Sequence, residues 1–112
     1  MMLKKVLLII EPHHKDDEKL KTNMAEIIDA GLAIASYEHE VHLWFQGESL
    51  KFLTAEKHLS ILDGLELYGI HHLWLSKENS IANALLKYSC NYIESKEQSK
   101  FKEQFDYILR FD

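Results

Sequence analysis

The sequence has a single cysteine, Cys90, a single proline and four glycines among its 112 residues. One thiol cannot form a disulfide within the chain, and proteins without disulfides are usual in the reducing cytoplasm. We therefore expect a cytoplasmic protein. The scarcity of proline and glycine argues against a disordered or low-complexity chain.

Long hydrophobic runs are also missing. No apolar stretch approaches the ~18 residues that a membrane-spanning helix needs, so we expect no membrane association. The N-terminal MMLKKVLLIIEPHH has a lysine pair followed by a short apolar run. That run meets Glu11 and Pro12 instead of a small-residue cleavage site, so it predicts a first strand and not a signal peptide.

An excess of positive charge is the third absence. The formal net charge is −5, and direct binding of nucleic acid normally needs a basic face. We therefore expect no direct contact with nucleic acid. Hydrophobic residues make up 46% of the chain and charged residues 28%, which is ordinary for a soluble globular protein. The length predicts one domain over residues 1–112.

What the chain does have is a regular alternation of strand and helix patterns. Residues 3–10 form a near-continuous apolar run, as in strands that helices cover on both faces. Residues 20–37 carry one apolar stripe at helical spacing. Strands are predicted at 3–10, 41–45, 70–75, 89–94 and 106–111, and helices at 20–37, 55–68, 78–88 and after the Ser95 capping pattern. This alternation predicts an α/β fold, a three-layer α/β/α sandwich around a mostly parallel five-stranded sheet.

The stretch VHLWFQG, residues 41–47, is the central aromatic strand and stops at a glycine. In parallel sheets covered by helices, ligands bind at the carboxyl ends of the strands. Gln46 and Gly47 follow the second strand, and Ser76 follows the third. We therefore expect these three residues to form a partner-binding or ligand-binding edge.

The sequence disfavours two kinds of site at that edge: a glycine-rich phosphate-binding loop and a receiver-domain magnesium site. The loop after the first strand contains no glycine, so it cannot form the backbone cradle of a dinucleotide site or P-loop. Asp16 and Asp17 are placed like the acidic pair of a receiver domain, but that site also needs an aspartate after the third strand. Leu75-Ser76-Lys77 stands there, so the acidic pair predicts a solvated helix N-terminus.

The seven histidines do not show the spacing of metal ligands. His71 and His72 are neighbours on a strand and point to opposite faces, and His39 and His42 also diverge. No Cys-x-x-Cys or His-x-x-x-His spacing is present. We expect surface or partly packed histidines, and no metal or cofactor.

The candidate nucleophiles and the large aromatic residues are also better explained as structural residues than as functional ones. Cys90 opens a short strand instead of following one, so we expect a small, half-buried thiol of the core. The alternative is a catalytic thiol. Ser76 lacks a nucleophile-elbow motif. We expect the large aromatic residues to lie in the core or in an interface and not to stack on bases; these are Trp44, Phe45, Tyr68 and Trp74.

Most of the chain resembles the DsrE/DsrF-like family of sulfur-relay proteins, and it is most similar to the TusC/DsrF type. The likeness rests on the alanine-rich first helix and its GLAIASYEHEV turn, followed by a strand that closes on Phe45-Gln46-Gly47. The LELYGI lead into the third strand and the closing YILRF also resemble the family. Residues 77–102 contribute little to it.

The resemblance implies a helix-covered parallel sheet and assembly with TusB-type and TusD-type siblings, or self-association. The best-known complex passes persulfide sulfur toward 2-thiolation of the wobble uridine of tRNA, and a related complex acts in sulfur oxidation. The carrier cysteine of the TusD/DsrE type lies just after the third strand, where this chain has Ser76. The resemblance therefore predicts a non-catalytic subunit. The alternatives are a stand-alone DsrE-like homo-oligomer with a thiol or small-ligand role for Cys90, and a nucleotide- or metal-dependent enzyme on a similar fold.

Overall fold

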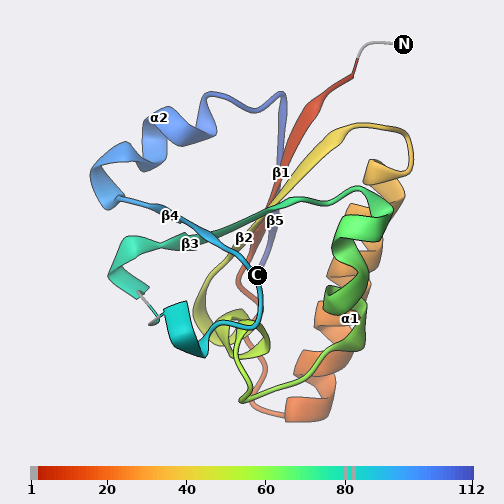
Figure 1. The fold of residues 1–112 in the computed structure, drawn as a ribbon, viewed down its shortest axis with the longest axis vertical. Helices are drawn as coiled ribbons and strands as arrows, with labels where there is room; N and C mark the ends of the chain where they lie inside the picture. Colours follow the sequence, from red (N-terminus) through yellow and green to blue (C-terminus); the bar gives the residue numbers. More distant parts are fainter. Residues whose placement is uncertain (1–2, 80, 82) are drawn as a thin grey trace.

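Five parallel strands form the centre of the protein. The computed structural model describes residues 3–79, 81 and 83–112. The strands follow the order β4-β3-β2-β1-β5 in the sheet (Figure 1), and each neighbouring pair is parallel. Their bounds are β1 Lys5–Ile10, β2 Glu40–Phe45, β3 His72–Ser76, β4 Asn91–Ile93 and β5 Tyr107–Phe111. The predicted α/β class and its five strands are confirmed.

Helix α1, Asp17–Ala35, covers one face of the sheet. Asp16 caps it by accepting a hydrogen bond from the backbone N–H of Glu18 at 2.9 Å, which explains why the helix begins three residues before the predicted start at 20. Its predicted stripe is largely buried and includes Gly31. A Cβ on Gly31 would lie 3.3 Å from Leu8 Cδ2, so this glycine lets the helix approach the sheet closely.

The predicted helix at 55–68 is wrong over residues 55–59 and in its type. The chain forms the 3₁₀ helices η1, Gly47–Leu53, and η2, Ser60–Tyr68. Thr54 does not N-cap the predicted helix; it is the C-cap residue of η1, and its hydroxyl donates to Lys51 O at 3.1 Å and accepts from Glu56 N at 3.2 Å. Gly69 ends η2 with a φ of 92°, as predicted for a C-terminal glycine.

The predicted helix at 78–88 is also wrong where the structure describes it. Two short 3₁₀ turns, η3 Lys77–Asn79 and η4 Asn83–Leu85, stand in its place, while positions 80 and 82 of that prediction lie outside the described residues. Leu86 instead forms an antiparallel bridge with Thr54. Lys87 N donates to Leu53 O at 2.8 Å, so pairing with a distant segment prevails over local helical periodicity.

The last crossover contains η5, Ser95–Glu97, and α2, Gln98–Lys102. The expected short helix is therefore present, but its capping box is not. Glu94 occupies the N-cap position of η5, and it makes no side-chain capping hydrogen bond. Ser95 is already the first residue of the turn.

The two faces of the sheet differ in their cover. From β1 to β4 the chain steps in one direction, whereas the connection from β4 returns to β5 at the other side of the sheet. Right-handed crossovers therefore place α1 and η2 on one face and η5 and α2 on the other (Figure 1). The α1 face buries mostly aliphatic side chains. The α2 face holds a smaller, aromatic cluster of Leu7, Ile9, Trp44, Ile93 and Phe101, with Trp74 and Phe105 packed against it.

Candidate functional site at the carboxyl edge of the sheet

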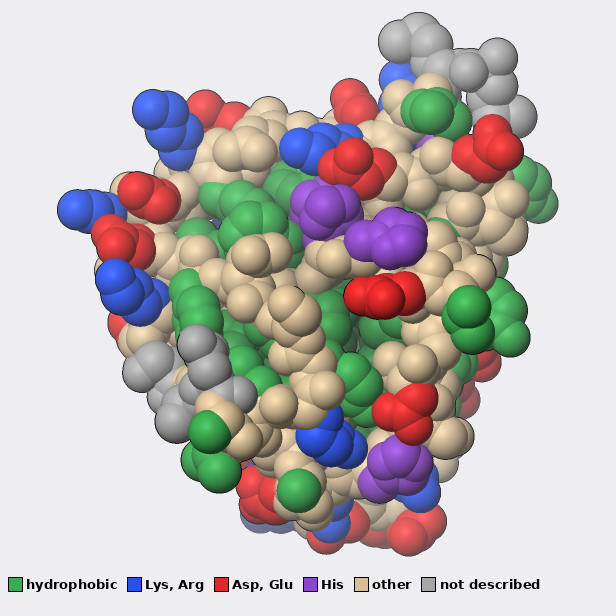
Figure 2. All heavy atoms as spheres, in the orientation of Figure 1, with side chains coloured by type: hydrophobic (Ala, Val, Ile, Leu, Met, Phe, Trp, Pro, Cys, Tyr) green, Lys and Arg blue, Asp and Glu red, His purple; other side chains and the backbone are tan. Residues whose placement is uncertain are grey.

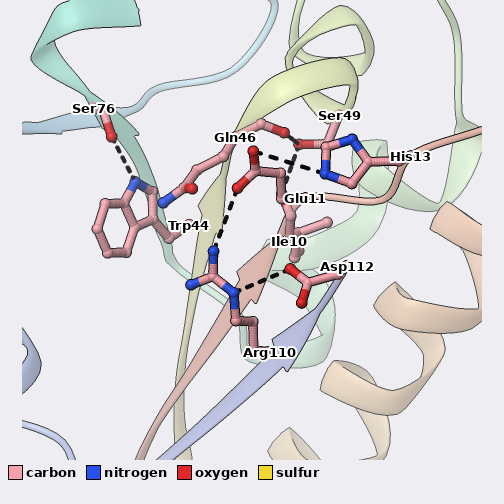
Figure 3. Close-up of polar contacts among 9 residues, drawn as sticks. All are labelled: Ile10, Glu11, His13, Trp44, Gln46, Ser49, Ser76, Arg110 and Asp112. Atoms are coloured by element: carbon pink, nitrogen blue, oxygen red, sulfur yellow. Dashed lines mark hydrogen bonds and ion pairs between the residues drawn. The ribbon is translucent and has the colours of Figure 1, made fainter.

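All five strands end at the same edge, here called the carboxyl edge, because they are parallel. The residues that end or follow β1, β2, β3, β4 and β5 are Glu11, Gln46, Ser76, Glu94 and Asp112. Figure 3 shows four of them with the side chains around them. This edge brings together the three residues that the sequence predicted as the site.

The Gln46-Gly47 turn is tied to the end of β1. Gln46 N donates to Ile10 O at 2.9 Å. The buried Ser49 hydroxyl lies 3.0 Å from Ile10 O and 2.7 Å from Gln46 O, so it holds the turn against the strand. Gly47 has a φ of +59°, and a Cβ there would lie 3.2 Å from Cγ of Glu11. Glycine is thus required by both backbone conformation and space.

Sequence reasoning placed Glu11 in the loop after the first strand, at this edge, but it missed Arg110 and the pairing of the two residues. Arg110 Nη2 lies 3.5 Å from Glu11 Oε1, and Arg110 Nε donates to Asp112 Oδ1 at 3.0 Å. His13 Nε2 lies 4.0 Å from Glu11 Oε2 (Figure 3). Two carboxylates therefore share the Arg110 guanidinium, which is not left to hold a phosphate alone. The available sequence signal was a charged residue at each of two strand ends.

Ser76 lies at the predicted edge, but its side chain does not face solvent. The residue is 5% exposed. Its hydroxyl accepts a hydrogen bond from the Trp44 indole N–H at 3.2 Å (Figure 3). An indole is a donor only and cannot take a proton from the serine. The arrangement fixes two neighbouring strands together and gives no base-activated nucleophile.

A charged hollow lies where β3 and β4 end. Lys77 Nζ is 2.9 Å from Glu94 Oε1, and Lys96 Nζ is 3.5 Å from Glu94 Oε2. The Lys77 hydrogen bond lowers the pKa of Glu94 below its usual value. The hollow has a volume of about 450 Å³ and is lined by Lys77, Glu78, Glu94, Ser95 and Lys96. The chain leaves β3 toward the α1 face and β4 toward the α2 face, and such a switch point is where α/β proteins bind ligands.

Cys90 lies at the opposite, amino edge of the sheet. It directly precedes β4 and is partly buried. Its thiol lies 3.5 Å from Tyr88 O, and burial raises the pKa of this thiol to about 11. The thiol stays protonated at neutral pH, so it is neither a ready nucleophile nor a ready metal ligand. The half-buried thiol expected from the sequence agrees with this geometry.

A histidine cluster on the α2 face was not predicted. His42 and His72 stand side by side on β2 and β3, and their rings stack with centroids 4.0 Å apart. His42 Nε2 lies 2.6 Å from Glu40 Oε2. One ligand atom from each of Glu40, His42 and His72 lies within 4.8 Å of the others. The sequence-based prediction compared only histidines that are close together along the chain. This group instead forms between the adjacent strands β2 and β3.

The hydrogen bonds of His42 oppose metal binding. Trp74 Nε1–H donates to His42 Nδ1 at 2.9 Å. Because an indole only donates, Nδ1 carries no proton and Nε2 carries the one that points at Glu40. A coordinating histidine has the reverse pattern, with a bare nitrogen at the metal and an N–H donated by the other. Burial lowers the pKa of His42, so the ring is a neutral, hydrogen-bonded part of the core.

The architecture and this edge define a class: a small α/β protein with a helix-covered parallel sheet and a polar carboxyl edge. No protein-family model and no curated protein matches the sequence. The structure is similar to the crystal structure of the ychN protein from E. coli, with a TM-score of 0.70. The match covers 97% of this chain and 100% of that chain at 14% sequence identity. At this identity the likeness shows a shared fold. Within the described residues, every helix is too short or too polar to span a bilayer.

Proposed function

We propose that this protein is a non-catalytic subunit of an intracellular sulfur-relay complex, of the TusC/DsrF type. The shared fold with the ychN protein supports this role, because a helix-covered parallel sheet is the architecture that the resemblance to the sulfur-relay family implies. The resemblance of the GLAIASYEHEVHLWFQG stretch to the same family supports it independently, because it rests on sequence and not on the fold.

The observation that carries the proposal is the absence of a usable nucleophile where β3 ends. Ser76 stands in the place of the family's carrier cysteine, and it is buried against Trp44. Lys77 follows it and pairs with Glu94. The chain's thiol, Cys90, lies at the other edge with a raised pKa. A subunit that supports a carrier needs no nucleophile of its own, whereas a carrier does.

The process we propose is persulfide transfer in the cytoplasm, for 2-thiolation of the tRNA wobble uridine or for sulfur oxidation. TusB-type and TusD-type siblings would be the partners. Acidic and basic side chains alternate over the face that Figure 2 displays, without one large basic patch among the described residues there. Together with the net charge of −5, this supports contact with tRNA by a sibling and not by this chain.

Co-purification tests the proposal. A tagged copy is expressed from its own locus, isolated under native conditions, and its companions are identified by mass spectrometry. We expect a small sibling with a cysteine after its third strand, at a fixed ratio to the tagged chain. Recovery of the chain without such a sibling would contradict the proposal.

A matched pair of variants locates the contact. Lys77→Glu reverses a charge at the carboxyl edge, whereas Lys21→Glu makes the same change on the exposed side of α1. We expect the first variant to lose the sibling and the second to retain it. Retention in both variants would place the contact away from the β3–β4 end.

A further inference from the structure

The edge strand β5 is unusually apolar for a strand with a neighbour on one side. It is the last strand of the sheet and pairs only with β1 among the described strands. Tyr107, Ile108 and Leu109 are 57%, 42% and 39% exposed. Edge strands are normally protected by lysine, proline, a bulge or a covering segment. The sequence of β5, YILRF, contains neither proline nor lysine.

We propose that β5 pairs with β5 of a second copy of this chain, antiparallel and with Ile108 on the two-fold axis. The two sheets then form one continuous sheet across the dimer. The exposed backbone edge of one copy finds its hydrogen-bonding partners on the other. The apolar side chains of both strands leave solvent at the same time.

Self-complementary charge argues that the occupant is a second copy. In an antiparallel pair, residues at equal distances from the axis face each other. With Ile108 on the axis, Asp106 faces Arg110 of the second copy, and the pairing occurs twice by symmetry. Tyr107 faces Leu109 of the second copy. Each pair is of a kind that stabilises antiparallel strands, opposite charges in one case and aromatic with aliphatic in the other.

Neighbouring registers lack this match. With Leu109 on the axis, Asp106 faces Asp112 and Ile108 faces Arg110, so like charges oppose each other. With Tyr107 on the axis, Asp106 faces Ile108. Asp106 and Arg110 are both exposed on β5 or directly beside it. Arg110 already contacts Glu11 and Asp112, and its half-exposed guanidinium would take Asp106 of the second copy as a further partner. Asp106 Oδ2 already accepts from Lys5 N at 2.7 Å, which holds the carboxylate at the start of the strand.

This inference goes beyond the proposed function, because pairing of two copies requires no sibling. Its tests use the purified chain alone. If β5 does not pair, the co-purification result still stands. If no sibling co-purifies, the pairing of β5 can still be measured.

Single cysteines on β5 test the pairing and its register. In a Cys90→Ala background, Tyr107→Cys, Ile108→Cys and Leu109→Cys are oxidised with diamide, and disulfide-linked dimers are measured by intact mass. Residues directly opposed in antiparallel strands have Cα atoms about 4.5–5.5 Å apart, which suits a disulfide. Only the residue on the axis faces itself, so we expect Ile108→Cys to cross-link at least about tenfold faster than the other two.

Leu67→Cys in the same background is the control, because Leu67 is a highly exposed apolar residue away from β5. It reports the rate of random collision. Cross-linking of Ile108→Cys at this control rate overturns the proposal, and so does fastest cross-linking of Leu109→Cys or Tyr107→Cys.

Charge exchange gives a second, independent measurement by sedimentation velocity. Asp106→Arg and Arg110→Asp each place two pairs of like charges across the axis, so we expect each to raise the dimer dissociation constant about tenfold. The double variant restores opposite charges and is expected to recover most of the affinity. A monomeric wild-type chain, or a double variant weaker than both singles, contradicts the proposal. If a charge variant fails to fold, the cysteine series still decides it.

Discussion

The two ends of the strands differ in chemistry. The carboxyl edge collects polar side chains, and the amino edge carries the thiol. At the carboxyl edge the groups bind one another: Arg110 pairs with Glu11, Lys77 with Glu94, and Ser76 accepts from Trp44. At the amino edge, Cys90 is partly buried with a raised pKa. The comparison teaches that polar side chains at a strand end do not by themselves form a reactive site. Whether the chain can act as a thiol nucleophile depends on where its cysteine lies.

Exchanging the thiol between edges should produce the largest effect. Lys77→Cys with Cys90→Ala moves the thiol to an exposed position after β3. Burial raises the pKa of Cys90 from 9.0 to about 11, which reduces its thiolate about a hundredfold. The greater nucleophilicity of a more basic thiolate offsets part of this loss. We expect iodoacetamide to modify the introduced thiol of the variant about tenfold faster than Cys90 of the wild type at neutral pH.

The control for this exchange is the same reaction in denaturant, where the two thiols should react at similar rates. Equal rates in the folded proteins would contradict the contrast between the edges.

The turn at the carboxyl edge provides the next largest effect. Gly47→Ala forces a Cβ onto a residue with a φ of +59°, close to Glu11. We expect a loss of about 1–2 kcal/mol in the free energy of unfolding, measured by urea denaturation. Gly64→Ala is the matched control, because the Cβ there would meet only the end of the Tyr68 side chain. A cost for Gly47→Ala no greater than that of the control would show that the turn does not require glycine.

The histidine cluster predicts a pH dependence of intermediate size. Burial lowers the pKa of His42 in the folded state, although Glu40 opposes this; His72 and Lys5 also face the ring and lower it further. The unfolded state then binds more protons below the ordinary pKa of about 6.5, so stability falls as the pH drops through that value. We expect the free energy of unfolding to decline from pH 7 toward pH 5.

His42→Phe should flatten this decline, even though it leaves the Trp74 N–H without its acceptor and lowers stability overall. An unchanged slope in the variant would remove His42 as the cause. Chemical denaturation at several pH values measures both slopes.

The exposed ion pair at the β3–β4 end should contribute least. Lys77 and Glu94 are both solvent-exposed, where screening and side-chain entropy offset most of the attraction. We expect Lys77→Gln to leave the midpoint of thermal unfolding unchanged at physiological salt. A clear fall in that midpoint would mean that the Lys77–Glu94 pair stabilises the fold, and it would contradict the view that these charges are available to a partner.

The fold could be predicted from the sequence because its signals are strong and local. The apolar run of β1, the helical stripe of α1 and the C-terminal glycine at Gly69 all appear in the structure. The helix predicted at 78–88 failed because Leu86 bridges Thr54, a contact between segments distant in sequence. Periodicity along the chain contains no information about such pairing.

The candidate site could be predicted only in part, for a related reason. Gln46, Gly47 and Ser76 lie at the expected edge, since the end of each strand was visible in the sequence. The Glu11–Arg110 pair requires β5 to lie beside β1, and strand order does not follow from alternation alone. The His42–His72 stack likewise depends on the register between β2 and β3.

The most direct test of a supporting subunit is whether this chain takes up sulfur. The purified protein and its Cys90→Ala variant are incubated with a persulfide donor, with a known carrier protein as the positive control, and intact masses are measured. Because Cys90 is partly buried and protonated, we expect the carrier to gain sulfur while the wild-type chain does not. A gain of one sulfur atom by the wild type that is lost in Cys90→Ala would contradict the account.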